Sequence, residues 1–275
     1  MKNITRINAR AKLNFTLDVL GKNNGMHLID SVVMPIDLFD EVALKINGTD
    51  QNFIKYSNRE SAYPFDTALR MADLIKTKYV TGGVDIVINK RIPERAGLGG
   101  SSADAAAVAR GMEELFDIKV DSGDLLDIGS DVNAMYVDAP CILAGIGERV
   151  EVIDAISPNI VLLILDSGVD TGECYHTYDV IGGKSGNRQA VLDGLREGKN
   201  FFPYNALTES AISLNAEIKE AIKILGEYFD GSMTGSGSAV FGIEYDDLIF
   251  DKKVDGLKKS VGNKYKIMTF RKKEK

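Results

Sequence analysis

The clearest chemical signal in this sequence is a segment rich in glycine and serine, residues 93–104 (PERAGLGGSSAD), that runs directly into an alanine-rich helical pattern. Glycines let backbone N–H groups converge on a ligand, and serines add hydroxyl donors. The helix that follows directs the positive end of its dipole at the same point. We therefore expect an anion site with phosphate as its natural ligand, although the segment alone also allows a purely structural turn and helix cap.

The spacing of these glycines excludes the familiar phosphate motifs. No lysine follows them as in G-x-x-x-x-G-K-[ST], and Gly97-x-Gly99 lacks the third glycine of a dinucleotide fingerprint. A G-x-S-x-G nucleophile elbow is also absent from the sequence. If the segment binds phosphate, it therefore does so as a different class of loop.

Two further segments accompany this loop: residues 11–14 (AKLN) near the start and residues 233–238 (MTGSGS) near the end. Together the three resemble, in order and content, the three motifs of the GHMP small-molecule kinases. The resemblance covers nearly the whole chain. It implies an α/β (α+β) fold of two domains, with the nucleotide and the acceptor meeting in the cleft between them.

Shorter matches indicate one branch of that superfamily, the 4-diphosphocytidyl-2-C-methyl-D-erythritol kinases. Residues 129–132 (GSDV) resemble the G-A-D-V of this branch, and residues 169–175 (VDTGECY) resemble its V-S-T-x-E-x-Y. Residues 205–209 (NALTE) are a loose form of its N-D-x-E. The implied activity is ATP-dependent phosphorylation of the 2-hydroxyl of 4-diphosphocytidyl-2-C-methyl-D-erythritol, in non-mevalonate isoprenoid precursor biosynthesis. A GHMP kinase for another small alcohol and a catalytically silent nucleotide or metabolite sensor stay open as alternatives.

The family pattern also implies where the domains divide. Residues 1–155 would form an N-terminal domain like domain 2 of ribosomal protein S5, containing the phosphate loop. Residues 156–275 would form a ferredoxin-like α/β domain. No linker composition marks the boundary in the sequence itself.

Lys12 and Asp131 are the residues to which the resemblance assigns catalysis. Phosphoryl transfer depends mainly on positioning and charge neutralisation. Asp131 would accept the proton of the acceptor hydroxyl or orient its oxygen, and Lys12 would stabilise the developing negative charge. Taken without the resemblance, Lys12 is an ordinary solvated strand lysine and Asp131 an ordinary turn residue.

ATP and Mg²⁺ are the implied cofactors. Ser102 is the candidate metal ligand, and Asp104 is interpreted as a first-turn residue favoured by the helix dipole. Asp66 takes the place of an Asn usual on the adenosine side of the family pattern. The residues implied to bind ATP are Pro93, Glu94, Arg95, Ala96, Gly97, Leu98, Gly99, Gly100, Ser101, Ser102, Ala103 and Asp66.

The acceptor implied by the family is a small molecule, a sugar alcohol linked to cytidine diphosphate. Its expected ligands are Asn14, His27, Thr171, Tyr175, Gly235, Ser236 and Gly237. Residues 235–237 would form a second backbone nest that faces the first across the cleft. His27 could hydrogen-bond a base or be structural, and Tyr175 with Tyr178 could be core or a stacking platform.

This chain departs from the family pattern at several positions. Met26 stands where the aromatic expected to stack on the cytosine would be, next to the retained His27. Asn133 replaces a usual Pro, and Ala103 replaces a second Ser. The departure at Met26 favours the alternative of a different acceptor.

Composition narrows the class of protein. The chain has 275 residues, 44% hydrophobic and 27% charged, with a formal net charge of −7, which disfavours a nucleic-acid binder. Its two cysteines, Cys141 and Cys174, and two histidines are too few for a disulfide framework or a structural zinc site, so we expect a cytoplasmic protein. We expect no membrane segment, since residues 160–165 are too short to span a bilayer, and a monomer or homodimer.

Hydrophobic periodicity predicts the elements that must position these groups. The predicted strands are residues 5–9, 12–19, 30–44, 83–89, 161–165 and 238–244. The predicted helices are residues 65–78, 102–116, 122–128, 189–196, 207–214 and 217–229. The stretch that follows residues 129–132 is expected to be irregular, and residues 271–275 are expected to form a solvated tail.

Overall fold

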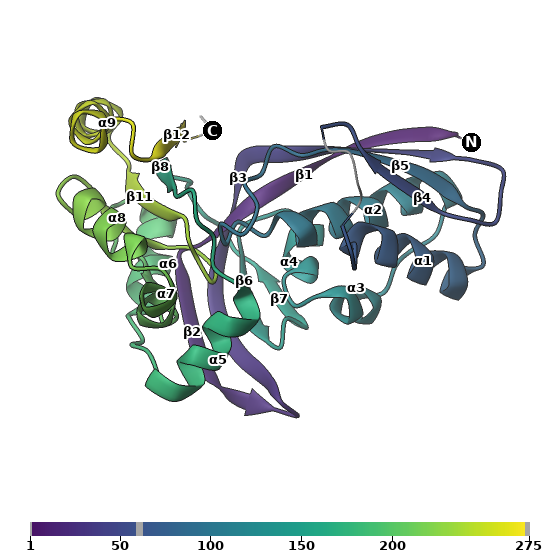
Figure 1. Cartoon of the computed structure of the whole chain (residues 1–275), viewed down its shortest axis with the longest axis horizontal. Coiled ribbons are helices and arrows are strands. Elements are labelled where there is room, and N and C mark those ends of the chain that lie inside the picture. The colour runs from purple at the N-terminus through teal and green to yellow at the C-terminus, as the bar shows by residue number, and fades with distance from the viewer. Residues whose placement is uncertain (1, 59–62, 273–275) are drawn as a thin grey trace.

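The computed structural model describes residues 2–58 and 63–272, and it folds them around two β-sheets (Figure 1). The larger sheet has eight strands and the smaller has four. The larger sheet contains β1 (Ile4–Asn14), β2 (Thr16–Asn23), β3 (Met26–Ile46), β4 (Phe53–Tyr56), β5 (Val84–Asn89), β6 (Cys141–Gly145), β7 (Arg149–Val152) and β9 (Tyr204–Asn205). The smaller contains β8 (Asn159–Ile164), β10 (Asp230–Met233), β11 (Val240–Glu244) and β12 (Lys266–Phe270). The mixed α/β class predicted from the sequence is confirmed.

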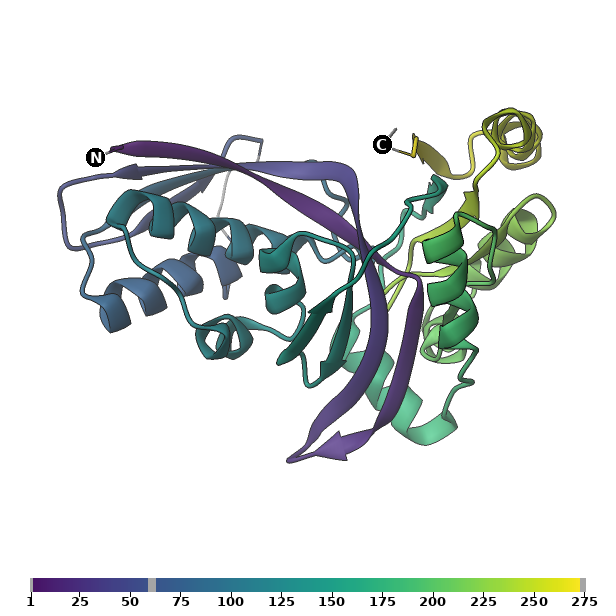
Figure 2. The same ribbon diagram turned by 180° about the vertical axis from the view of Figure 1, so that it is seen from behind.

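The helices fall into two groups along the chain. The first group is α1 (Thr67–Tyr79), α2 (Gly100–Phe116), α3 (Ser122–Ile128) and α4 (Val132–Val137). The second is α5 (Thr171–Ile181), α6 (Arg188–Glu197), α7 (Thr208–Leu214), α8 (Glu217–Gly226) and α9 (Asp247–Val261). Figures 1 and 2 show the first group gathered on one face of β1, β3, β4 and β5, and the second group around the smaller sheet except for α5, which lies beside the hairpin of β2 and β3. In the described part of the chain, no helix has both the length and the apolar character needed to cross a membrane.

Strand β3 organises the larger sheet. It is 21 residues long and pairs with β1, β2, β5 and β6, all antiparallel. Both views show it curving from the N-terminal helices down into a hairpin with β2 beside α5 (Figures 1 and 2). One strand therefore runs from the sheet that carries the first group of helices into the hairpin beside α5.

Small side chains let α2 pack closely on the sheet. Five of its ten buried residues are alanines, and Gly111 lies so near the sheet that a Cβ there would come within 2.5 Å of Leu44 Cδ1. The alanine-rich pattern thus has a packing reason, because larger residues would push the helix away from the sheet. The approach fixes where the N-terminus of α2 points.

The hydrophobic core extends across the domain boundary predicted at residues 155 and 156. Phe15, between β1 and β2, packs against Phe201 and Phe241, with ring centroids 5.4 Å apart in both pairs. Strand β2 also pairs in parallel with β9, with Thr16 opposite Tyr204. The division at residues 155 and 156 stays a prediction, and the two sides share one buried cluster.

The sequence prediction was wrong about the stretch that follows residue 132, which is not irregular but forms α4, β6 and β7. These elements are short, so their periodicity is weak. The prediction also missed β4, α5, β9, β10, α9 and β12. Helix α9 had a usable signal, because its buried Phe250, Val254, Leu257 and Val261 follow helical spacing.

The expectation of a solvated tail was also wrong for the residues that are described there. Arg271 forms an ion pair with Asp251, and Lys272 Nζ lies 3.2 Å from Asp247 Oδ2. Both acidic partners lie on α9, so these basic residues dock the end of the chain onto that helix. Residues 273–275 lie outside the described residues.

Candidate active site

A single cleft of about 850 Å³ brings together most of the residues predicted to act. Its walls come from β1, β3, the loop before α2, the start of α4, the start of α5 and the turn after β10. The predicted residues on its walls are Lys12, Asn14, His27, Asp66, Pro93, Glu94, Arg95, Ala96, Gly97, Leu98, Gly99, Gly100, Ser101, Ser102, Asp131, Thr171, Tyr175, Gly235 and Ser236. Segments far apart in the sequence therefore converge on one space.

Two predicted residues are not brought to the walls of this cleft. Ala103 is buried in the first turn of α2, where its side chain belongs to the core. Gly237 lies behind the cleft, and a Cβ there would come within 2.8 Å of Met233 Sδ. Both positions are close-packed backing for the loops, because neither has room for a larger side chain.

The phosphate loop reaches α2 through a series of left-handed residues. Arg95, Gly97 and Gly99 have φ of +54°, +76° and +73°. Gly99 is the N-cap of α2 and supplies no side-chain cap, and the first N–H with a partner in the helix is that of Ala103, which donates to Gly99 O at 2.9 Å, so the N–H groups of residues 100–102 are open to a ligand. The helix begins two residues earlier than Ser102, the predicted start. This geometry suits an anion.

The two glycine loops touch each other. A Cβ on Gly97 would lie 2.1 Å from Thr234 O, and a Cβ on Gly235 would lie 2.6 Å from Gly97 O, so only glycine fits at either position. Ala239 N also donates to Ala96 O at 3.2 Å. The expectation that the loops face each other across the cleft was wrong, because they form one continuous wall.

Lys12 is buried and aimed at Asp131. Its side chain is 4% exposed, and Nζ lies 3.3 Å from Asp131 Oδ2 while it donates to Asn14 Oδ1 at 2.6 Å. The register of β1 against β3 shifts between Arg10 and Lys12, which re-aims the strand at this point. The alternative of a solvated strand lysine is therefore excluded. Asp131 is 31% exposed and open to the cleft.

Asn14 connects three segments behind this pair. Its Nδ2 donates to Ser31 Oγ at 2.7 Å, and Gly235 N donates to its Oδ1 at 3.0 Å. Its own backbone N–H donates to Thr234 Oγ1 at 3.0 Å. Because Oδ1 already accepts two hydrogen bonds, Asn14 fixes the geometry of Lys12 and of the second glycine loop. Its contact with substrate stays a prediction.

The hairpin of β2 and β3 closes the other end of the cleft. His27 packs on Tyr175 with ring centroids 4.6 Å apart, and its Nε2 lies 2.8 Å from Asp179 Oδ1. Lys22 Nζ lies 2.6 Å from the other oxygen of Asp179. Hydrogen bonds from Lys22 and then His27 lower the pKa of Asp179. Met26 is 45% exposed on the cleft wall, where its thioether is open to a ligand.

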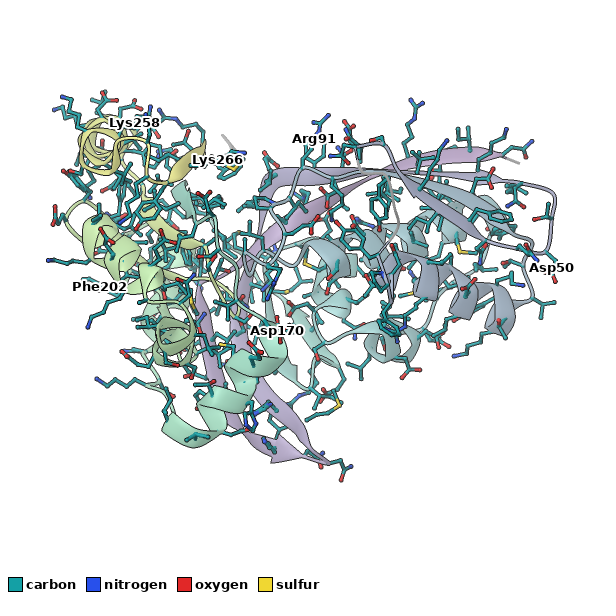
Figure 3. The ribbon with its side chains drawn as sticks, in the orientation of Figure 1. Asp50, Arg91, Asp170, Phe202, Lys258 and Lys266 are labelled. Carbon is teal, nitrogen blue, oxygen red and sulfur yellow. The ribbon has the colours of Figure 1, made fainter. Side chains whose placement is uncertain are left out.

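Helix α5 presents only one of its two tyrosines to the cleft. Tyr175 lines the cleft, and burial raises the pKa of its phenol. Tyr178 packs against the hydrophobic cluster that contains Cys174 and Leu207, and its hydroxyl donates to Val19 O at 3.4 Å. Asp170, labelled in Figure 3, caps α5. The hydroxyl oxygens of the next residue, Thr171, and of Ser236 lie 2.9 Å apart. Cys141 and Cys174 are both buried, as predicted.

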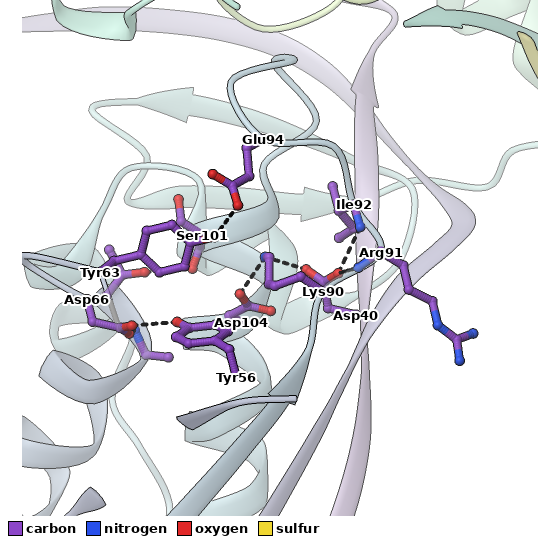
Figure 4. Close-up of polar contacts among 12 residues, drawn as sticks. Asp40, Tyr56, Tyr63, Asp66, Lys90, Arg91, Ile92, Glu94, Ser101 and Asp104 are labelled. Carbon is purple, nitrogen blue, oxygen red and sulfur yellow. Dashed lines mark hydrogen bonds and ion pairs between the residues drawn. The ribbon is translucent and has the colours of Figure 1, made fainter. Parts of the chain in front are cut away.

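Asp66 lines the cleft, but both oxygens of its carboxylate already accept hydrogen bonds within the protein. Its Oδ1 accepts from Ala68 N and Leu69 N at 3.0 and 3.1 Å, which caps α1. Its Oδ2 accepts a short hydrogen bond from the hydroxyl of Tyr56 (Figure 4). A carboxylate cap fits here because its charge is favourable at a helix N-terminus. Binding of ATP by Asp66 stays a prediction.

A buried ionic network supports the phosphate loop from behind (Figure 4). Lys90 Nζ lies 2.5 Å from Asp40 Oδ2 and 2.7 Å from Asp104 Oδ2. Asp40 Oδ1 accepts from the N–H groups of Arg91 and Ile92, at the entry to the loop. Strand β3, the loop and α2 are therefore tied at one point.

Charge in this network is unbalanced. Asp40 and Asp104 are both buried against the one ammonium of Lys90. Burial raises the pKa of Asp104 to about 7 against the pull of Lys90. Burial alone would lower the pKa of Lys90, but attraction to Asp104 and Asp40 outweighs it and raises that pKa. The first-turn interpretation of Asp104 was wrong, since it lies beyond the first turn and is ion-paired.

Sequence reasoning gave no role to Asp40 or Lys90. A signal was present, because Asp40 is two residues from each of the buried Leu38 and Val42 along β3 and so lies on the same inward face. A charged residue on an inward face needs a partner. The sequence could have indicated that need, but not which residue meets it.

Comparison with known proteins decides the family. The model of the GHMP kinase N-terminal domain matches residues 66–145. The chain is 31% identical to the 4-diphosphocytidyl-2-C-methyl-D-erythritol kinase of Clostridioides difficile (strain 630), over 95% of this chain and 92% of that one. It is 34% identical to the enzyme of the same name from Bacillus velezensis, over 86% of each. The chain belongs to this family of kinases.

Solved structures agree with that membership. A crystal structure of 4-(cytidine 5'-diphospho)-2C-methyl-D-erythritol kinase superimposes with a TM-score of 0.79 at 26% identity, covering 98% of this chain and 100% of that one. Homoserine kinase from Cytophaga hutchinsonii gives a TM-score of 0.67 at 14% identity, over 99% and 96%, and shares the fold. This kinase therefore has the GHMP architecture over its whole length.

The described residues of this kinase contain no group of three or more His, Cys, Asp and Glu side chains that could hold a metal ion. Mg²⁺ in kinases is held mainly by substrate phosphates and water, with one or two protein oxygens. The Ser102 hydroxyl and the Asp131 carboxylate both line the cleft and supply oxygen of that kind. The donor set therefore fits a nucleotide-bound Mg²⁺ but not a dedicated metal centre.

Proposed function

We propose that this kinase transfers the γ-phosphoryl group of ATP to the 2-hydroxyl of 4-diphosphocytidyl-2-C-methyl-D-erythritol. The observation that carries the proposal is the Lys12–Asp131 pair, with 3.3 Å between Nζ and Oδ2, in the same cleft as the glycine-rich N-terminus of α2. A phosphate donor and an alcohol acceptor can meet there. Family membership supports the choice of acceptor.

The acceptor hydroxyl would be activated by this pair. Asp131 is exposed enough to meet a hydroxyl and would accept its proton or orient its oxygen toward the phosphorus. Lys12, almost fully buried and held by Asn14, would stabilise the negative charge that develops on that oxygen. Because Lys12 is fixed before the substrate arrives, little reorganisation is needed during transfer.

The phosphates of ATP would lie against the loop and the first turn of α2. The backbone N–H groups of residues 100–102 would donate to them, and the helix dipole adds a favourable field. Mg²⁺ would neutralise phosphate charge, held on the protein side by the Ser102 hydroxyl with the Asp131 carboxylate nearby. The loop is kept rigid by its contact with the second glycine loop and by the network of Lys90.

The cytidine end of the acceptor would lie between the hairpin and α5. His27 would hydrogen-bond the edge of the base, and Tyr175 would offer its ring face. Met26 would contribute a thioether contact where a second aromatic is expected. Met26 is also the observation that favours the second candidate, a GHMP kinase that phosphorylates another small alcohol.

Release of ADP tests the proposal. Purified protein is incubated with Mg-ATP, with and without 4-diphosphocytidyl-2-C-methyl-D-erythritol, and the product mass is measured. ADP release that depends on the acceptor, with a product heavier by one phosphoryl group, supports the proposal. ATP binding without such turnover rejects this acceptor, and a panel with mevalonate, homoserine and simple sugars then tests the second candidate. Binding without turnover across the panel would indicate a silent sensor.

A further inference from the structure

Phe65 is the most exposed large apolar residue among those named on the cleft walls. It is 94% exposed and lines the cleft just before α1. Its φ of +64° lies in the left-handed region, which bulky side chains rarely adopt. Two unfavourable features thus coincide at one residue. The exposed ring contributes no burial free energy to folding, and the backbone conformation is strained.

The neighbours of Phe65 hold it in this conformation. Asp66, the next residue, is fixed by its cap of α1 and by the hydroxyl of Tyr56. Tyr63, two residues earlier, hydrogen-bonds Glu94 of the phosphate loop, and its ring meets Tyr56 edge-on with centroids 5.0 Å apart (Figure 4). The strained residue is therefore flanked on both sides by anchored ones.

The position also lies close to the phosphate loop. Thr67, two residues after Phe65, donates from its hydroxyl to Ser101 O at 2.9 Å, in the first turn of α2. A nucleotide whose phosphates lie against that turn can extend its base toward residues 63–67. The carboxylate of Asp66 would not read such a base, because both of its oxygens already accept hydrogen bonds from the protein.

We propose that Phe65 stacks on the purine ring of the bound nucleotide and so covers the base end of the cleft. The inference rests on the proposed use of ATP. Stacking on an aromatic ring needs only the π-face of a base, and an exposed, pre-positioned phenyl ring provides it. Phe65 is thus a determinant of affinity for the base, without contact to the reacting atoms.

Binding measurements on ring variants test this role. Phe65→Ala and Phe65→Leu remove the aromatic face, Phe65→Trp retains one, and dissociation constants are measured calorimetrically for Mg-ATP and for Mg-tripolyphosphate, which has no base. We expect Phe65→Ala and Phe65→Leu to weaken ATP binding about tenfold. Phe65→Trp should bind ATP within about twofold of the native protein, and tripolyphosphate binding should be unchanged in all three.

Phe202 provides a matched control. It is 77% exposed and does not line the cleft, and Figure 3 shows it among the helices of the smaller sheet, away from Arg91 at the loop entry. Phe202→Ala should leave ATP binding unchanged. The inference is overturned if Phe65→Ala binds ATP as tightly as the native protein, if Phe65→Leu equals the native protein, or if tripolyphosphate loses as much affinity as ATP.

These outcomes are separable from those of the proposed function. Native protein that binds ATP but shows no turnover with the cytidyl acceptor rejects that acceptor and leaves the Phe65 measurements valid. Native protein that binds no ATP rejects the proposed function and this inference together. Since Phe65 is exposed, the variants should unfold at the same temperature as the native protein, and a Phe65→Gly variant, which suits the left-handed backbone, checks the loss of the ring without strain.

Discussion

Lys12 Nζ and Asp131 Oδ2 lie 3.3 Å apart, although one residue belongs to the first strand and the other precedes α4. Their exposure differs sharply, since the Lys12 side chain is 4% exposed and that of Asp131 is 31% exposed. The lysine is therefore a fixed charge inside the protein, and the aspartate is the partner that a substrate can reach. This asymmetry is the reason that we propose different roles for them.

Asp131→Asn should abolish most turnover without loss of ATP binding. The amide cannot accept the hydroxyl proton, whereas Lys12 remains held by Asn14 and the loop is untouched. We expect kcat to fall by about 10² to 10⁴-fold, the usual contribution of a general base. Steady-state kinetics and a separate ATP titration provide the measurement, and retained turnover would remove Asp131 from catalysis.

Lys12→Met combined with Asp131→Asn should be no worse than the more damaging single variant. The two residues act as one unit, so the loss of either removes most of what the pair supplies. We expect Lys12→Met alone to lower kcat by about 10² to 10³-fold, as for the loss of one preorganised charge. Comparison of kcat for the native, single and double variants gives the coupling, and strictly multiplicative losses would show that the residues act independently.

Lys90→Met should destabilise the protein strongly and in a pH-dependent way. It leaves Asp40 and Asp104 buried together without a cation, a loss of about 3–5 kcal/mol. The pKa of Asp104, already raised by burial, would rise further. A carboxyl whose folded pKa exceeds its unfolded one loses stability as the pH rises through the folded value, so the defect should be larger at pH 8 than at pH 5.

Urea unfolding of Lys90→Met at the two pH values measures this effect. Adding Asp104→Asn should restore part of the stability at pH 8, because one buried charge is removed. Lys199→Met, at a side chain that is 75% exposed, is the control and should change little. Equal losses at both pH values would contradict the account of unbalanced charge.

Asp179→Asn should weaken binding of the acceptor while sparing ATP. Asp179 joins Lys22 and His27 of the hairpin to α5. A neutral amide there would weaken both contacts, and His27, whose ring would read the base, would be held less firmly. We expect the KM for the cytidyl acceptor to rise about threefold to tenfold, with kcat and the KM for ATP close to native. Asp193→Asn, on an exposed ion pair, is the matched control. An unchanged acceptor KM would show that the hairpin needs no such tie.

Local sequence determined much of the fold and the position of the glycine-rich loop before α2. Alternation along β1 and β5, helical spacing in α1, and the glycines before α2 each act through neighbours in the chain, which the sequence lists directly. Burial, φ preference and capping are short-range effects, so pattern alone predicts them. The roles of Lys12 and Asp131 came from family motifs, because their own neighbourhoods are unremarkable.

Tertiary structure decided the contacts between distant segments. Gly97 against Gly235 and Lys90 between Asp40 and Asp104 join strands, loops and helices that no local pattern connects. Asp66 shows the same limit, since only the folded chain reveals that its oxygens are occupied by α1 and Tyr56. The physical reason is that such contacts depend on how close-packed elements approach one another, which the sum of many side chains sets and no single segment encodes.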